Sequence, residues 1–404
     1  MTLAAAFDDF LTSKVNLSDA QLIRLNDRVD AVTGYLREKS HFAAYIDDFV
    51  PQGSLAQKTI IRPLNKPVFD ADVLMRVNAI PGWSAKDYVE ELKQAFLNSS
   101  TYQGMAHRRT RCVYVDYADE FHIDVVPHVI ANSSVTNRQL NAYELSLPEN
   151  FNRWLDGKDR IASGNLPEVI RLLKWLRDKR GNATKSLFLS VLVGHRIDAW
   201  KTSLDSGYYA DVPTAFAHVV ADLATYLQGQ VSLPAIYDPA QTGCDLADRW
   251  TPEGYTALRN WVTLTLAPKV AAAFAADLSL AEPLWQDVFG TDFKLTSTAL
   301  GTKAAGSLAP RTEQWLDRTF GIPMRLSEKV ELVGRVRQHG VVNKAYDLPS
   351  RGNRVGKGRE IDFEVRSSTV SGPFDLYWKV RNYGAEASDL DALRGGSSGP
   401  LAEC

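Results

Sequence analysis

The pattern of hydrophobic and polar positions changes period along the chain, and each change marks a predicted element. Residues 19–38 carry apolar side chains at spacings of three and four, and the pair Ser18 and Gln21 forms the pattern of a capping box, so a long helix is predicted. Residues 68–77 alternate instead, which is typical of a strand. Further elements are predicted as a helix at 85–97 and strands at 112–117 and 121–129.

From about Pro148 onward the pattern is helical. Gly, Pro and Asn breaks divide it into helices predicted at residues 166–179, 185–199, 213–228, 252–277 and 282–288. Small residues between Thr298 and Pro310 indicate a linker, and β-like alternation returns at 360–365 and 374–380. We therefore predict an α+β protein. Its predicted parts are a sheet lobe with the long N-terminal helix at 1–150, a helical lobe at 151–297, a linker at 298–312, a small β-rich domain at 313–396 and a disordered tail at 397–404.

Composition excludes several classes of protein. The net charge of −2 argues against a generally basic nucleic-acid coat. The three cysteines lie far apart and form no C-x-x-C pair, so neither a disulfide framework nor a thiolate zinc site is expected. The chain has no run of about 18 apolar residues, and its first residues lack the features of a signal peptide. We expect a cytoplasmic protein with no membrane partner.

Three carboxylates carry the strongest chemical signal. Asp70 and Asp72 leave the same face of the strand at 68–77, and Asp124 lies on the polar face of the strand at 121–129. If the two strands are neighbours, the three acids form one cluster, which needs a cation to stay ionised. Oxygen ligands of this kind suit Mg²⁺ or Mn²⁺, and two such ions activate a hydroxyl and stabilise departing pyrophosphate. The alternative is that Asp70 and Asp72 are solvent-facing acids on an edge strand.

Other polar residues near this motif are weaker candidates. Gly53 and Ser54 form a turn that lets the backbone approach a phosphate, with the serine amide and hydroxyl as donors. His122 and His128 share a strand face with Asp124, but a hard Mg²⁺ site prefers oxygen, so supporting hydrogen bonds or packing are favoured. The basic run 107–111 is either a solvated charged turn or a contact for phosphates or nucleic acid.

The combined motif resembles a known family. The segments Gln52-Gly-Ser54, Asp70-Ala-Asp72 and His122-Ile-Asp124 look like those of the polymerase-β-type nucleotidyltransferases. More narrowly they resemble the bacterial relatives of cyclic GMP-AMP synthase and oligoadenylate synthase, the cGAS/DncV-like nucleotidyltransferases of antiphage (CBASS) signalling. The resemblance implies that Gln52, Gly53 and Ser54 bind nucleotide, and that Asp70, Asp72 and Asp124 are catalytic and bind two Mg²⁺ or Mn²⁺ ions.

The resemblance extends into the helical part. The segments 171–177 and 185–192 resemble the helix pair that grips the nucleotide triphosphate in this family. By that match, Lys174 and Ser186 touch phosphates, and Lys185 is a further nucleotide-binding candidate. The implied substrates are ATP and also GTP, and the implied product is a cyclic di- or trinucleotide. A separate effector protein would sense this product.

A second resemblance concerns the C-terminal region. Residues 377–387 and 393–395 look like the small β-rich sensor domain (AGS-C type) that often follows these synthases. In that family the domain continues well beyond this position, whereas few residues follow Gly395, so we expect a truncated domain. The family also suggests an operon-encoded regulator or a conjugating enzyme as partners, and it suggests no nucleic-acid substrate.

Two other functions stay open at this point. One keeps the chemistry and changes the product, to a linear oligoadenylate or a tailed RNA. The other is a catalytically silent nucleotide-binding scaffold, which the presence of all three acids argues against. Neither the base selectivity nor the ring size of the product follows from residue spacing.

Overall fold

The structure is a computed structural model of the 404-residue chain, and it describes two compact units, Met1–Ala299 and Leu300–Cys404. In the first unit it describes residues 3–64, 68–117, 121–181 and 184–295. In the second unit it describes the backbone of the strands at 330–338, 346–347, 359–368, 378–379 and 397–398. The predicted linker at 298–312 lies outside the described residues.

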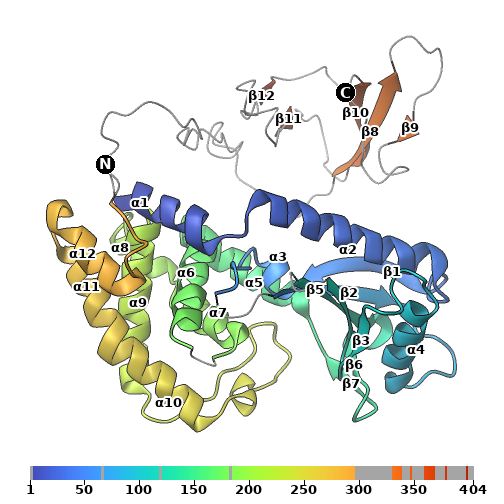
Figure 1. Cartoon of the computed structure of the whole chain (residues 1–404), viewed down its shortest axis with the longest axis horizontal. Helices are drawn as coiled ribbons and strands as arrows, with labels where there is room; N and C mark the ends of the chain where they lie inside the picture. The colour runs from blue at the N-terminus through green and yellow to red at the C-terminus, as the bar shows by residue number, and fades with distance from the viewer. Residues whose placement is uncertain are drawn as a thin grey trace. The chain divides into compact units, whose positions relative to one another are not determined.

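A sheet with helices on one face forms the first lobe (Figure 1). Its strand order is β1-β2-β5-β4-β3, and β6 pairs with both β5 and β7. The central pair β2 and β5 is parallel, whereas the other pairs are antiparallel. The strands are β1 (Ile46–Gln52), β2 (Phe69–Val77), β3 (Ala106–Arg108), β4 (Val113–Tyr117), β5 (Phe121–Val129), β6 (Ser134–Asn137) and β7 (Ala142–Leu145).

One face of this sheet is covered by two helices, α2 (Asp19–Lys39) and α4 (Ala85–Leu97). The alternate apolar residues of β2, from Phe69 to Val77, are buried in one cluster with Leu25 of α2 and Leu92 of α4. The helix α2 begins with the predicted capping box, in which Ser18 and Gln21 bond reciprocally. Because this face is closed by helices, the residues between the apolar ones, including the acids of β2, face the other side.

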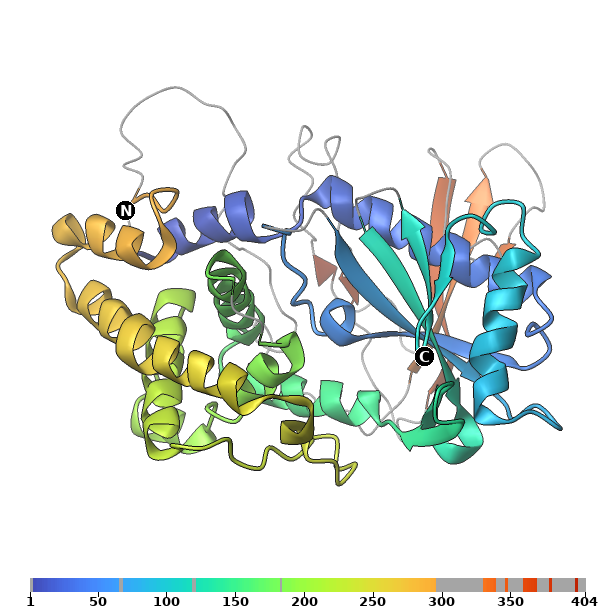
Figure 2. The same ribbon diagram turned by 60° about the horizontal axis from the view of Figure 1, so that its bottom comes forward.

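Helices form the second lobe, which lies beside the sheet in Figure 2. Residues from its helices share one apolar cluster with Phe7 and Phe10 of α1 (Leu3–Phe10). The N-terminal segment therefore connects both lobes, because α1 packs into the helical core and α2 into the sheet core. The other helices are α5 (Pro148–Ile161), α6 (Leu166–Lys179), α7 (Ser186–Gly194), α8 (Ala199–Leu204), α9 (Val212–Gly229), α10 (Pro252–Trp261), α11 (Ala267–Ala275) and α12 (Leu278–Phe289).

Several elements differ from the sequence prediction. The helix predicted at 185–199 ends at Gly194, and a separate helix, α8, begins only at Ala199. The helix predicted at 252–277 contains a π-helical stretch, Val262–Leu266, between α10 and α11. The strand β1 was not predicted, because Pro51 argues against a strand. Its place at the edge of the sheet explains how the proline is tolerated.

The strands described in the second unit pair antiparallel. The strands β8 (Val330–Gln338), β9 (Tyr346–Asp347) and β10 (Arg359–Ser368) pair in the order β10-β8-β9. The strand β11 (Trp378–Lys379) pairs with β12 (Ser397–Ser398), which falls within the predicted tail at 397–404. Residues 399–404 lie outside the described residues.

No helix in the described parts of the chain combines the length and the apolar character that crossing a membrane requires.

Candidate active site

The predicted acids meet on two paired strands. The parallel strands β2 and β5 are in a register that sets Asp72 opposite Asp124 and Asp70 opposite His122. Residues opposite each other in a sheet point to the same face, so these four side chains lie on the face that the helices leave uncovered. The structure thus places the three predicted carboxylates on one face of two neighbouring strands, with His122 beside them.

A glycine turn closes over Asp72. The strand β1 ends at Gln52, which is the register partner of Asp72, and the short helix α3 (Gly53–Ala56) follows. Gly53 has a φ of +58°, and a Cβ built on it would collide with Oδ2 of Asp72. Glycine is therefore required here for two reasons, the left-handed backbone and the close approach of the turn to a carboxylate.

Two cavities meet at this turn. One, of about 600 Å³, is lined by Gly53, Ser54, Asp70, Asp72, Lys174 and Ser186 among others. The other, of about 610 Å³, is lined by Gln52, Gly53, Asp72, Asp124 and residues of the 240–249 segment. Gly53 and Asp72 line both cavities, so the carboxylate motif stands between two spaces that are each large enough for a nucleotide.

The surroundings of Asp72 and Asp124 disfavour the ionised form of both carboxyl groups. Burial raises the pKa of Asp72 to about 7, and the negative charges of Asp70 and Asp124 contribute to this rise. Burial also raises the pKa of Asp124, whereas the guanidinium of Arg109 acts in the opposite direction. The side chain of Asp124 is only 8% exposed, and its Oδ1 atom is buried without a hydrogen-bond partner among the described residues.

These features fit a divalent cation. In the described parts of the chain, no three His, Cys, Asp or Glu side chains stand close enough together to hold a metal ion as they are placed. A bound cation would satisfy the orphaned Oδ1 of Asp124 and would lower the raised pKa of Asp72. Asp70, Asp72 and Asp124 are thus the residues that could hold a metal.

Cations of the helical lobe line the first cavity. Lys174 is buried, and its Nζ donates to the carbonyl and the hydroxyl of Thr59 at 2.9 and 2.8 Å. Burial lowers the pKa of Lys174 to about 7, and nearby Arg177 contributes to this decrease. Arg177 donates to the hydroxyl of Ser186 at 3.0 Å. Lys185, in contrast, is exposed and is not among the described residues that line either cavity.

Arg177 and Thr59 also line this cavity, and the sequence reasoning missed both. Arg177 lies three residues after Lys174 in α6, and this spacing alone puts both cations on one helix face. That signal was available in the sequence. Thr59 is different, since it follows α3 in an irregular segment and only the tertiary structure brings it to Lys174.

The basic run 107–111 is paired with acids. Arg108 forms an ion pair with Glu90, Arg111 with Glu144 at 2.5 Å, and Arg109 with Asp124 at 2.7 Å. The run is therefore more than a solvated turn, because one of its members reaches the carboxylate motif. His128 is buried, and its Nε2 lies 3.1 Å from the carbonyl of Ser146, consistent with the predicted supporting role.

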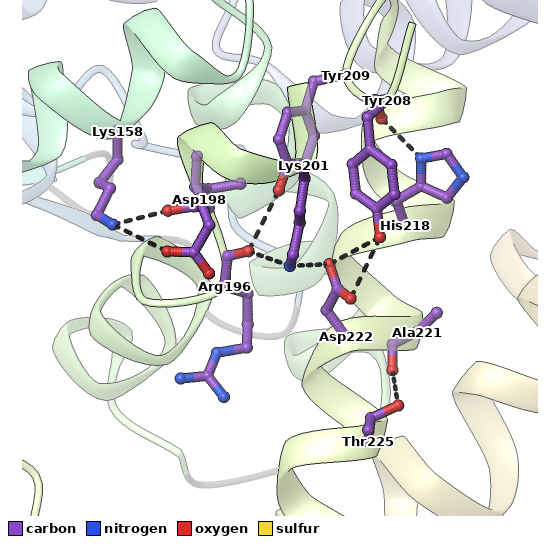
Figure 3. A network of polar contacts seen from close by, with 11 residues as sticks. Lys158, Arg196, Asp198, Lys201, Tyr208, Tyr209, His218, Ala221, Asp222 and Thr225 are labelled. Carbon is purple, nitrogen blue, oxygen red and sulfur yellow. Dashed lines mark hydrogen bonds and ion pairs between the residues drawn. The ribbon is translucent and has the colours of Figure 1, made fainter. Parts of the chain in front are cut away.

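A separate polar network lies in the helical lobe (Figure 3). Buried Lys201 of α8 donates to Asp222 of α9 at 2.7 Å and to the carbonyl of Arg196 at 2.9 Å, and the Tyr208 hydroxyl also bonds to Asp222. These residues line a third cavity of about 570 Å³, which shares no lining residue with the other two. The network fixes the α7–α8 connection to α9, and it contains none of the predicted site residues.

Two family models match the chain. Residues 1–159 match the Second Messenger Oligonucleotide or Dinucleotide Synthetase domain, and residues 310–401 match the Adenylyl/Guanylyl and SMODS C-terminal sensor domain. A c-di-GMP synthase from Roseivirga ehrenbergii is 26% identical over 160 residues, which are 37% of this chain and 43% of that relative. The aligned part thus spans less than half of the curated relative.

Solved structures share the fold. The CdnC protein of E. coli MS115-1, solved with ATP, has a TM-score of 0.55 at 21% identity, with 72% of this chain and 98% of that chain covered. The DncV cyclic AMP-GMP synthase of Vibrio cholerae, solved with a nonhydrolyzable GTP, has a TM-score of 0.56 at 14% identity, with 72% and 96% covered. These matches make the chain similar to the cGAS/DncV-like nucleotidyltransferases, with a synthetase domain matched at residues 1–159, a shared fold over 72% of the chain and an AGS-type sensor domain matched at residues 310–401.

Proposed function

We propose that the protein is a metal-dependent synthase that makes a cyclic di- or trinucleotide from ATP, and also from GTP, as a second messenger in antiviral signalling. The observation that carries this proposal is the position of Asp72, which stands opposite Asp124 and lines both cavities. One cavity can hold a donor triphosphate and the other an acceptor nucleotide, with the acids between them. The E. coli protein solved with ATP and the Vibrio cholerae protein solved with a nonhydrolyzable GTP support these substrates.

The cavity next to α6 suits the donor triphosphate. Ser54, Lys174 and Arg177 line it, and they supply a hydroxyl and two cationic groups for phosphate oxygens. The carbonyl and the hydroxyl of Thr59 accept hydrogen bonds from the Nζ of Lys174 and so hold the amine in place at the wall of the cavity. A phosphate would also raise the lowered pKa of Lys174, because a nearby anion favours the charged amine.

The acids would bind the cations and orient the acceptor. Asp70 and Asp72 would hold both ions and Asp124 one of them, and the bound Mg²⁺ or Mn²⁺ would supply charge neutralisation at the reacting phosphate. Asp124 would also assist loss of the proton of the acceptor hydroxyl. That hydroxyl attacks the α-phosphate and pyrophosphate leaves, and a second transfer with the intermediate turned around closes the ring. The residues contribute mainly by positioning the reactants and by balancing charge.

Product analysis tests this proposal. The full chain is incubated with the four NTPs and Mg²⁺ or Mn²⁺, then treated with phosphatase, and the products are identified by mass spectrometry. We expect a phosphatase-resistant product that contains adenine, because a ring has no terminal phosphate. A phosphatase-sensitive ladder would instead assign a linear oligoadenylate or RNA-tailing activity, and nucleotide binding without pyrophosphate release would assign a silent scaffold.

A pair of variants separates chemistry from folding. Replacing both Asp70 and Asp72 with Asn should lower turnover by at least about 10³-fold, since metal ions contribute several kcal/mol to such reactions. Asp48→Asn is the matched control, because Asp48 is exposed on the edge strand β1, where it pairs with Arg37. Equal turnover in the double variant and the control would overturn the proposed function.

The biological partners remain part of the proposal. A separate effector would bind the cyclic product, and an operon-encoded regulator or conjugating enzyme would act on the synthase. The CdnC protein of E. coli MS115-1 has also been solved in a complex with a HORMA protein, which supports a regulator of that kind. Co-purification of the tagged full chain with proteins encoded beside it tests this part.

A further inference from the structure

Arg109 makes three contacts around the third acid. It follows β3, and its Nη1 donates to Oδ2 of Asp124 at 2.7 Å. Its Nη2 lies 3.3 Å from Nε2 of His122, and its guanidinium carbon lies 4.2 Å from the centre of the Tyr114 ring. The side chain of Arg109 is 44% exposed. Its contacts with an acid, an imidazole and an aromatic ring nevertheless fix the orientation of its guanidinium group.

The strand order defines the side from which Arg109 approaches. Asp124 of β5 lies opposite Asp72 of β2 on one side and opposite Tyr114 of β4 on the other. Because Arg109 stacks on Tyr114, it reaches Asp124 from the β4 side. The thiol of Cys112, just before β4, donates to the same Oδ2 atom at 3.4 Å. Two donors from one side therefore hold one oxygen of the carboxylate.

The other oxygen is left without a donor. Oδ1 of Asp124 is buried and has no hydrogen-bond partner among the described residues, and His122 Nε2 lies 3.9 Å from it. A buried, unsatisfied carboxylate oxygen costs free energy unless something else binds it. Rotation of the carboxylate away from this position would break the bonds from Arg109 and Cys112. The bonds from Arg109 and Cys112 to Oδ2 therefore leave Oδ1 of Asp124 free to bind another group.

We propose that Arg109 is a positioning residue that clamps Oδ2 of Asp124 and so presents Oδ1 to the divalent cation shared with Asp72. This inference rests on the proposed metal-dependent function. Outer groups of this kind orient a metal ligand, and their loss typically weakens metal binding by about 10- to 100-fold. If Arg109 instead occupied the place of the cation, its removal would strengthen metal binding. The two roles thus predict opposite signs.

Binding of Mn²⁺ to the full chain without nucleotide tests the clamp. Titrations followed by the electron paramagnetic resonance of free Mn²⁺ give the dissociation constant of each variant. We expect Arg109→Ala to bind Mn²⁺ about 10- to 100-fold more weakly than the wild type. Arg109→Lys should recover part of this loss, because lysine keeps the charge but lacks the planar fork. Arg108→Ala is the control, since Arg108 pairs with Glu90 and should leave Mn²⁺ binding unchanged.

The outcomes separate the clamp from the proposed function. Wild-type protein that binds Mn²⁺, together with Asp72→Asn protein that does not, supports the metal site. If Arg109→Ala then binds Mn²⁺ as tightly as the wild type, or more tightly, the clamp is overturned and the metal site stands. If the wild type does not bind Mn²⁺, the proposed metal dependence and the clamp are both overturned. Thermal unfolding of each variant shows that the comparison is made between folded proteins, and Arg109→Gln replaces Arg109→Ala if the latter unfolds.

Discussion

Replacing Asp72 by Asn should make the metal-free protein more stable while it removes the proposed activity. Burial and two neighbouring acids raise the pKa of Asp72 from 3.8 to about 7. A shift of about 3 units corresponds to about 4 kcal/mol of unfavourable free energy for the ionised side chain. Asp72 keeps part of its contact with solvent, and Asn is also costly to bury, so we expect about half of this, roughly 2 kcal/mol, as a gain in stability.

The gain depends on pH with a definite sign. The folded protein keeps the Asp72 proton until the pH rises to about 7, whereas the unfolded chain loses it near 3.8. The folded state thus binds more protons between these values, and the free energy of unfolding of the wild type falls as the pH rises through this window. The Asp72→Asn variant does not show this fall in the free energy of unfolding, because its side chain carries no titrating proton. The difference between the two proteins is therefore small near pH 4 and complete above pH 7.

Urea-induced unfolding in EDTA at several pH values measures this difference. Asp48→Asn is the control on the same sheet, and we expect it to change stability by less than about 0.5 kcal/mol, as exposed substitutions usually do. Added Mn²⁺ should stabilise the wild type and leave Asp72→Asn unchanged, since only a state that binds the ion gains from it. An Asp72→Asn protein that is less stable than the wild type above pH 7 would refute this reasoning.

Three further substitutions test other parts of the structure. Gly53→Ala should lower turnover at least about 100-fold, because the added Cβ collides with the carboxylate of Asp72. Gly82→Ala is the control, since Gly82 also has a positive φ but has open space around it, and this variant should keep its turnover. Equal losses of turnover in the two variants would contradict the collision. Asp222→Ala should lower the free energy of unfolding by about 3–5 kcal/mol in urea titrations, because it leaves the ammonium of Lys201 buried without a carboxylate partner. An unchanged midpoint of urea unfolding would show that the network does not stabilise the helical lobe. Lys174→Met should weaken ATP binding, measured by calorimetry, by about 10-fold or more. The wild type should bind ATP more tightly below pH 7, where Lys174 gains its proton, and the variant should not. The same dependence of ATP binding on pH in both proteins would contradict this role.

Much of the fold was accessible from local patterns. The strand β5, the helix α4 and the helix α6 begin and end where the sequence predicted, since each has a clear period and clear end signals. The capping box at Ser18 is confirmed, because it depends on two residues that are close in sequence. These elements carry their own information, so no tertiary contact was needed to find them.

Other elements depend on contacts between distant residues. The short helix α1 packs through Phe7 and Phe10 against the helical lobe, although it precedes the sheet in sequence. The edge strand β1 exists because it pairs with β2, and its own pattern is weak and contains a proline. Neither feature follows from periodicity, because periodicity does not tell which surfaces will meet.

The same distinction applies to the site. Asp70 and Asp72 were found because a period of two places them on one face, and Asp124 because its strand has the same pattern. Arg177 was accessible from its spacing to Lys174, but Arg109 was not. Its role depends on the order of β2, β5 and β4 in the sheet, and strand order is a tertiary property.

The polar groups around the two cavities are difficult to explain by stability alone. Lys174 lines the same cavity as Asp70 and Asp72, yet among the described residues it forms no ion pair with either of them and bonds to Thr59 instead. A site built only for stability would pair these opposite charges, which would return the pKa values of Lys174 and Asp72 toward their ordinary values. Separated charges with strongly shifted pKa values are typical of sites that await a ligand. A triphosphate with its cations has the charges to fill that gap, because its oxygens suit Lys174 and its metal ions suit the acids.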